Sequence, residues 1–176
     1  MKEFDNQAAV FGGNGNMGKL TQRLLKDVGF ETTSPDPRNP SSPRPIDAIR
    51  GSRAIFFSVL PIEEIPKIIE ATQDAFGPSH LVLDNASVKG PLRDTYSALE
   101  AKGVSICSTH PLFKPDQPTH GQKALIMPVG ANSREARELA EKLYASAGIK
   151  LVHYSFGDHD KNMVVVQALP HVVMRA

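Results

Sequence analysis

The chain has 176 residues, 40% of them hydrophobic, and a formal net charge of +1. This length and composition predict one globular domain with a substantial core. The balanced charge does not indicate a basic surface for binding nucleic acid. No apolar run approaches the roughly 20 residues of a membrane span, and the polar start MKEFDNQ does not resemble a signal peptide. We therefore expect a cytoplasmic protein without nucleic-acid or membrane partners, and a single buried cysteine, Cys107, rather than a reactive thiol.

Segments typical of strands and of helices alternate along the chain. Short apolar runs predict strands at residues 7–11, 30–34, 53–60, 80–84, 104–108, 123–130 and 149–155. Apolar residues at helical spacing predict helices at residues 16–29, 62–77, 90–103, 133–148 and 159–176. Ser133 is the expected N-cap of the fourth helix, and Gly148 is its expected C-terminal stop. The alternation indicates an α/β protein with a mostly parallel sheet and helices on both faces.

One stretch departs from this alternation. Residues 35–45 read PDPRNPSSPRP and contain five prolines, which exclude a helix. We expect an exposed, extended connection there, in the place of a second crossover helix. Only IDAIRG, residues 46–51, remains to supply a turn or two of helix.

The loop between the first strand and the first helix is rich in glycine. It reads VFGGNGNMG, in which Gly13, Gly15 and Gly18 fit the pattern G-x-G-x-x-G. The first glycine allows a tight turn, the second lets a pyrophosphate approach the backbone, and the third lets the helix pack on the strand. The helix that begins at Asn16 and Met17 would then face the phosphates. In this context the motif predicts a doubly wound, Rossmann-type sheet, against the alternative of a glycine-rich turn without a ligand.

Asp36 is the candidate residue for recognising the ribose of a dinucleotide. It lies 23 positions after Gly13, close to the usual spacing of about 20. A carboxylate there accepts hydrogen bonds from the ribose hydroxyls and repels a 2′-phosphate, which favours NAD. Arg38 could instead pair with that phosphate, so NADP stays possible. Asp36 could also be a plain turn residue between two prolines.

Four further motifs follow the later strands in order. They are SVLPIEEI at residues 58–65, LDNASVKGPL at residues 83–92, STHPLFKPD at residues 108–116, and HDKNMVVVQALPH at residues 159–171. In this order and spacing they resemble the prephenate/arogenate dehydrogenase family of tyrosine biosynthesis, over about residues 8–176. The resemblance implies NAD-dependent oxidative decarboxylation of prephenate to 4-hydroxyphenylpyruvate, or of arogenate to tyrosine. It departs from the family pattern at Lys114, where the family usually has glycine.

The resemblance also implies roles for individual residues. His110 matches the catalytic histidine, which accepts the proton of the substrate hydroxyl as a hydride leaves for the nicotinamide. Ser87 matches the serine that hydrogen-bonds that hydroxyl, and Lys89 and His171 would lie near the substrate. The residues expected to lie beside the cofactor are Ser58, Val59, Leu60, Pro61, Asp84 and Ala86.

Simpler interpretations of these residues stay open at this point. His110 could merely hydrogen-bond a loop carbonyl. Ser87 could cap the helix that follows it, and Lys89 could be a surface charge. No group of histidine, cysteine and carboxylate residues has metal-ligand spacing, so we expect no metal.

The resemblance divides the chain into two parts. Residues 1–156 are the expected NAD(P)-binding Rossmann domain, and residues 157–176 the first helix of a helical dimerisation and substrate domain that is otherwise absent. A homodimer through this C-terminal helix is therefore expected. The alternatives are a cofactor-binding or dimerising module without efficient turnover, a dehydrogenase of an amino-substituted prephenate analogue, and a reductase of the imine or β-hydroxyacid type.

Overall fold

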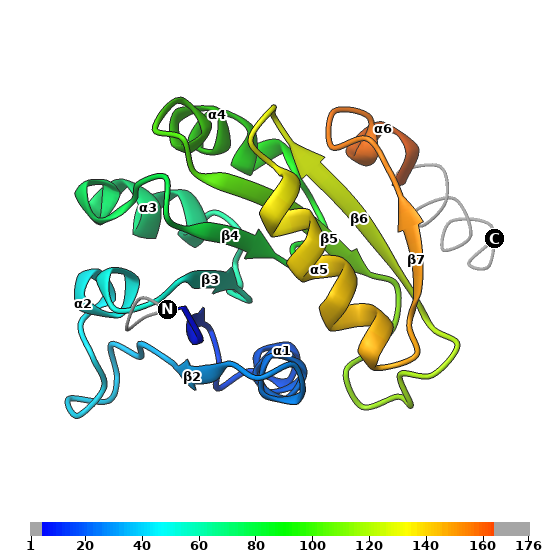
Figure 1. Cartoon of the computed structure of the whole chain (residues 1–176), viewed down its shortest axis with the longest axis horizontal. Coiled ribbons are helices and arrows are strands. Elements are labelled where there is room, and N and C mark those ends of the chain that lie inside the picture. Colours follow the sequence, from blue (N-terminus) through cyan, green and yellow to red (C-terminus); the bar gives the residue numbers. More distant parts are fainter. Residues whose placement is uncertain (1–4, 164–176) are drawn as a thin grey trace, which may run out of the picture.

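A seven-stranded sheet forms the centre of the structure, a computed structural model that describes residues 5–163 (Figure 1). The strands are β1 (Gln7–Phe11), β2 (Glu31–Thr33), β3 (Ala54–Phe57), β4 (Leu81–Asp84), β5 (Ser105–Pro111), β6 (Lys123–Val129) and β7 (Lys150–His153). Their order across the sheet is β2-β1-β3-β4-β5-β6-β7. Neighbouring strands are parallel except β5 and β6, which pair antiparallel. The predicted mostly parallel, doubly wound sheet is confirmed.

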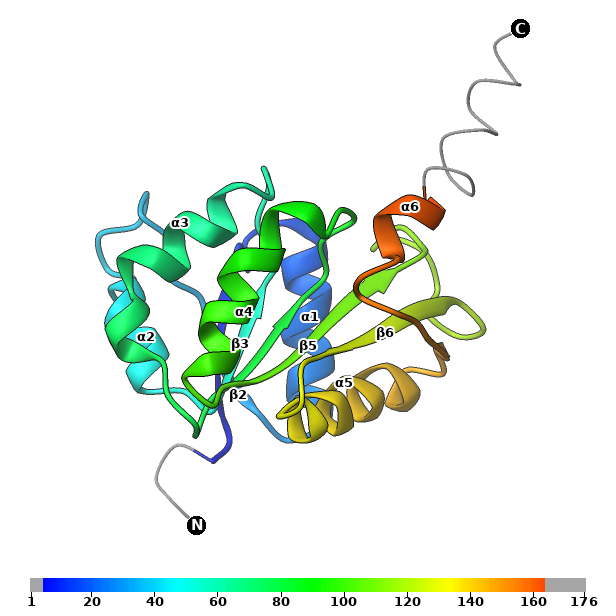
Figure 2. The ribbon, with the colours of Figure 1, turned by 90° about the horizontal axis from the view of Figure 1, so that it is seen from above.

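Helices cover both faces of this sheet (Figure 2). They are α1 (Asn16–Asp27), α2 (Pro45–Arg50), α3 (Glu64–Ala71), α4 (Arg93–Ala101), α5 (Arg134–Ser146) and α6 (His159–Met163), with short 3-10 turns at Gln73–Ala75 and Gly90–Leu92. One apolar cluster joins α1 and α5 to the sheet, and a second cluster joins α2, α3 and α4 to the opposite face. The central strands read as continuous apolar runs because both of their faces are buried.

The chain changes direction across the sheet after β1, and this reversal positions the site. β1 is followed in sequence by β2 on one side, whereas β3 lies against β1 on the other side. In an open α/β sheet, the crevice at such a switch point lies outside the carboxyl ends of the strands. The segments after β1, β3, β4 and β5 all emerge at this edge.

Several local expectations need correction. The helix predicted at 62–77 begins only at Glu64 and is α-helical to Ala71. Ser133 does hold the N-cap position of α5, but its hydroxyl donates to the carbonyl of Gly130 and makes no cap bond to the helix. Gly148 does follow the end of α5 with φ +70°, as expected of a helix-terminating glycine.

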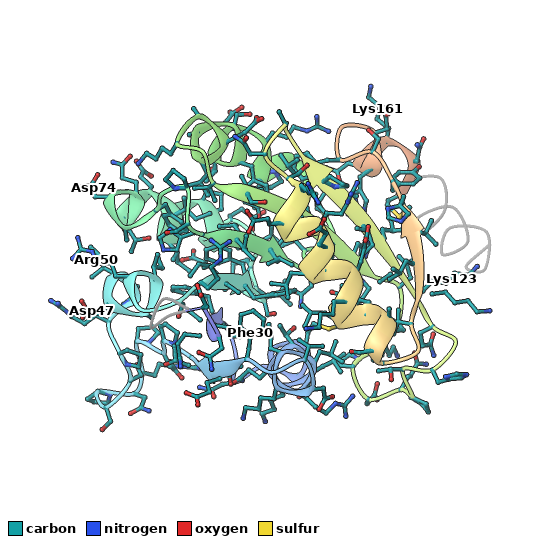
Figure 3. All side chains as sticks on the ribbon, in the orientation of Figure 1. Phe30, Asp47, Arg50, Asp74, Lys123 and Lys161 are labelled. Atoms are coloured by element: carbon teal, nitrogen blue, oxygen red, sulfur yellow. The ribbon has the colours of Figure 1, made fainter. Side chains whose placement is uncertain are left out.

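Charged side chains stand at the periphery of the described part of the chain (Figure 3). Figure 3 labels examples on several elements, namely Asp47, Arg50, Asp74, Lys123 and Lys161. No helix among residues 5–163 is long and apolar enough to cross a membrane. Of the helix predicted at 159–176, only the part to Met163 belongs to the described residues.

Candidate active site

A cavity of about 810 Å³ opens beside the glycine loop. Gly13 and Gly15 of the loop line it, together with Asn16 and Met17 at the start of α1. The sharp turn of the loop, however, falls on Gly12, whose φ is +78°. A Cβ on Gly12 would come within 2.3 Å of the Ser58 carbonyl oxygen. The tight-turn role assigned to Gly13 therefore belongs to Gly12, which the motif left out.

The third glycine of the motif lets α1 approach β1. A Cβ on Gly18 would lie 2.2 Å from the carbonyl oxygen of Gly12, so only glycine permits this packing. Gly18 itself does not line the cavity. Gly15 is the N-cap of α1 and offers no side chain to the first N–H groups of the helix. These N–H groups have no intrahelical partner, which leaves an anion-binding helix end at the cavity.

Asp36 lies at the same cavity, held by two neighbours. Asn14 donates to Asp36 Oδ2 at 2.6 Å, and the backbone N–H of Arg38 donates to Oδ1 at 3.0 Å. The Arg38 guanidinium, which is largely exposed, hydrogen-bonds the same carboxylate and holds the pKa of Asp36 below its usual value. Asp36 is therefore an oriented anion at neutral pH. Asn14 had no signal in the sequence beyond its place in the loop.

The segment after β3 forms another wall of the cavity. Ser58, Val59 and Leu60 line it, whereas Pro61 does not. Asn85 Nδ2 donates to Ser58 Oγ at 2.9 Å, which ties the ends of β3 and β4 together. The Leu60 side chain is 81% exposed.

Asp84 and Lys89 occupy places other than those predicted. Their side chains form an ion pair, with Lys89 Nζ 2.7 Å from Asp84 Oδ1 and no exposed surface on either side chain. Lys89 Nζ also donates to the carbonyl oxygens of Ala86 and Thr109. All three ammonium protons are thus used, so Lys89 is neither the surface charge nor the direct substrate ligand that the sequence suggested. Asp84 likewise faces the interior, where Tyr96 donates to its other oxygen at 2.8 Å.

Ala86 is held by the same arrangement. Its backbone N–H donates to Asp84 Oδ1 at 2.9 Å. Neither Asp84 nor Ala86 lines the cavity at the glycine loop. Asp84 instead faces the interior and fixes the start of the loop after β4 through the backbone of Ala86.

His110 lies near the carboxyl end of β5 and is 5% exposed. Its Nδ1 is 2.9 Å from Nε2 of His159, the first residue of α6. Burial, assisted by the nearby charge of Lys89, lowers the pKa of His110 to about 4. The imidazole is therefore neutral at pH 7 and able to accept a proton. Its partner is a side chain, not the loop carbonyl of the simpler interpretation.

A second contact extends from His159. Its Nδ1 lies 2.7 Å from Asp160 Oδ1, and the Asp160 carboxylate accepts the backbone N–H groups of Lys89 and Gly90. Burial lowers the pKa of His159, although Asp160 acts in the opposite direction. The sequence marked His159 as part of a motif but gave no sign of its contact with His110.

The two remaining predicted residues stand apart from these contacts. Ser87 is exposed and has no hydrogen bond among the described residues, and it caps no helix, because Lys89 and Leu92 hold the N-cap positions that follow. His171 lies outside the described residues. Within residues 5–163, no group of three or more histidine, cysteine, aspartate or glutamate residues could hold a metal ion.

The cavity and His110 occupy different parts of one edge. The cavity lies over β1, β2 and β3, and His110, two strands further along, does not line it. Pro115, which follows β5, does line the cavity, so the chain returns there directly after His110. A ligand spanning both places would run along the carboxyl edge of the sheet, as dinucleotides do in this architecture.

The sheet, the glycine loop and the cavity together define the dinucleotide-binding α/β fold of dehydrogenases. No family model matches the sequence. Among curated proteins, the chain is 26% identical over 162 residues to the T-protein of Enterobacter agglomerans, covering 92% of this chain. It is 24% identical over 186 residues to the "Probable arogenate/prephenate dehydrogenase" of Methanocaldococcus jannaschii, covering 97% of this chain. The predicted resemblance to this group of proteins is thereby confirmed.

Solved structures show the same fold. A prephenate dehydrogenase from A. aeolicus, in complex with hydroxyphenyl propionate and NAD+, has a TM-score of 0.74 at 18% identity and matches 98% of this chain over 68% of its own. An imine reductase from Myxococcus stipitatus in complex with NAD+ has a TM-score of 0.72 at 14% identity, over 98% of this chain and 63% of its own. The chain spans about two fifths of the length of the curated relatives, at 42% and 41%.

Proposed function

We propose that this chain is the nucleotide-binding part of an NAD-dependent dehydrogenase that oxidatively decarboxylates prephenate or arogenate. The observation that carries the proposal is the cavity at the switch point, where the uncapped end of α1 and the oriented carboxylate of Asp36 meet. The curated relatives supply the substrate class. A homodimer formed through residues 157–176 belongs to the same proposal.

The residues at the cavity suit a dinucleotide. Gly13 and Gly15 keep side chains away from the phosphate-binding end of α1, and a cavity of about 810 Å³ is large enough for a nucleotide. Asp36 would accept the ribose hydroxyls, and its negative charge favours NAD over NADP. When bound, NAD supplies the two-electron acceptor of the reaction.

The chain's own chemistry centres on His110. Because its imidazole is neutral at pH 7, it can accept the proton of a substrate hydroxyl as that carbon is oxidised. All three N–H donors of Lys89 are used within the protein, so Lys89 would act indirectly, by fixing the conformation of the loop that carries Ser87. Ser87 is exposed on that loop, where it could reach a substrate.

The test combines nucleotide binding with turnover. Isothermal titration of the purified protein with NAD should show saturable binding, and added prephenate or arogenate should produce NADH absorbance. The variant His110→Asn should keep NAD affinity within about twofold and lose turnover, whereas His153→Asn, an exposed control, should retain both. Absence of NAD binding would refute the proposal. Binding without turnover of either substrate would leave only a nucleotide-binding module.

A second candidate is a reductase of the imine type. The imine reductase above matches this chain with a TM-score of 0.72, close to the 0.74 of the prephenate dehydrogenase. The fold alone therefore does not separate the two activities. NADPH oxidation with a cyclic imine, in the absence of activity towards prephenate and arogenate, would favour this second candidate.

A further inference from the structure

The carboxylate of Asp160 is fixed by the backbone of another segment. Its Oδ1 accepts the N–H of Lys89 at 2.8 Å, and its Oδ2 accepts the N–H of Gly90 at 2.6 Å. Gly90 leaves room for this approach, since a Cβ there would come within 3.3 Å of Oδ2. Asp160 is thus an oriented acceptor that belongs to α6 and is held by the loop after β4.

The direction of each hydrogen bond follows from this acceptor. An ionised carboxylate can only accept, so the proton between Asp160 and His159 resides on Nδ1 of His159. A neutral imidazole with a protonated Nδ1 has a lone pair on Nε2. His110 Nδ1, 2.9 Å away, must then be the donor. The remaining ring nitrogen of His110, Nε2, carries the lone pair and has no hydrogen-bond partner among residues 5–163.

We propose that His159 and Asp160 are positioning residues that hold His110 in its Nδ1–H tautomer and so present Nε2 as the proton acceptor. The tautomer is a property of the chain itself, and only its catalytic use rests on the proposed function. An oriented carboxylate plays the same part for the histidine of a catalytic triad, where it fixes ring and tautomer without taking the proton. Here a second imidazole is placed between carboxylate and base.

The charges around His110 agree with this arrangement. Lys89, in the loop after β4, and Asp84, at the end of β4, act electrostatically on His110, as do His159 and Asp160 of α6. The cation of Lys89 disfavours a second positive charge, which keeps the resting imidazole neutral. The carboxylates of Asp84 and Asp160 act the other way and stabilise the imidazolium that forms when Nε2 takes a proton.

The tautomer can be read without turnover. Long-range proton–nitrogen NMR spectra of the ¹⁵N-histidine-labelled protein, without nucleotide at pH 7, should show His110 protonated at Nδ1 and unprotonated at Nε2. In His159→Leu, which removes the acceptor, His110 should shift towards the Nε2–H tautomer that free histidine favours. In His159→Gln, whose amide oxygen can still accept, the Nδ1–H form should persist in part. His153→Leu, a change at an exposed histidine, should alter nothing.

Two results would overturn the proposal: an Nε2–H tautomer of His110 in the unchanged protein, or an unchanged tautomer in a folded His159→Leu variant. Should that variant not fold, the spectrum of the unchanged protein and the His159→Gln variant decide the matter. Where the protein turns over, His159→Leu should lower kcat by about 10²- to 10⁴-fold with KM little changed, and His159→Gln should restore part of it. A protein without turnover that shows the expected tautomers would contradict only the proposed function.

Discussion

Lys89 and Asp84 form an ion pair in which neither side chain has any exposed surface. The pair joins the end of β4 to the loop that follows it, and its ammonium group also binds the backbone of β5 through the carbonyl oxygen of Thr109. Burial lowers the pKa of Lys89, and the neighbouring charge of Asp84 opposes that effect. Breaking such a pair is costly because one charge stays buried without a partner.

We therefore predict that Lys89→Met destabilises the protein by about 3–5 kcal/mol. Urea denaturation followed by circular dichroism measures this change. The matched control is Lys67→Met, which removes a largely exposed ion pair with Glu64 and should change the free energy of unfolding far less. Equal costs for the two substitutions would show that burial of the Lys89 pair is not important for stability.

Asp36 should determine the choice between NAD and NADP. Because Asp36→Ala removes a charged hydrogen-bond acceptor, it should weaken NADH binding roughly 10- to 100-fold. NADPH binding should weaken far less, because the repulsion of its 2′-phosphate is lost as well. Fluorescence titration with both nucleotides checks this, with Asp74→Ala, a change at an exposed carboxylate, as the control. Equal loss for both nucleotides would remove Asp36 from the ribose site.

Alanine substitutions at two glycines of the motif should affect different properties, namely stability and NAD binding. Gly18→Ala places a methyl group against backbone atoms of Gly12 and Gly13, so it should destabilise the protein by at least about 1–3 kcal/mol. Gly15→Ala meets only the Gly12 carbonyl oxygen at 3.3 Å and should remain folded, but it should lose NAD affinity. Gly77→Ala, with nothing within 4 Å, is the control for both. Thermal melts measure the loss of stability, and NAD titrations measure the loss of affinity.

Stability should fall as the pH is lowered from about 6.5 to 4. Burial and Lys89 depress the pKa of His110 to about 4, whereas an unfolded chain has a histidine pKa near 6.5. In this range the unfolded state binds more protons, and the change from His110 alone amounts to about 3 kcal/mol. His159 and His80, whose pKa values burial also lowers, act in the same direction.

Urea denaturation at several pH values between 7 and 4 measures this dependence. The variant His110→Asn should flatten the curve. A His110→Asn protein with the full pH dependence of the original would show that His110 does not contribute to it.

The sequence was sufficient for the parts of the fold that depend on local pattern. Apolar runs and helical spacing located most of the strands and helices, and the glycine motif lies at the cavity beside α1. Local pattern could not show that Lys89 is buried, because a lysine between a valine and a glycine is usually a surface residue. Its burial depends on Asp84, five positions earlier, whose carboxylate faces the interior. The contact between His110 and His159 joins residues 49 positions apart, and only tertiary packing creates it.

The bond between Lys89 and Thr109 has a mechanical consequence. Thr109 Oγ1 also donates to the carbonyl oxygen of Asp84, so the ends of β4 and β5 are fastened together in both directions. Widening the sheet at this point would separate the buried ammonium group of Lys89 from an acceptor that it needs. We therefore expect the ends of β4 and β5 beside His110 to be rigid, and any movement that admits a ligand to involve more exposed segments, such as the one that carries Leu60.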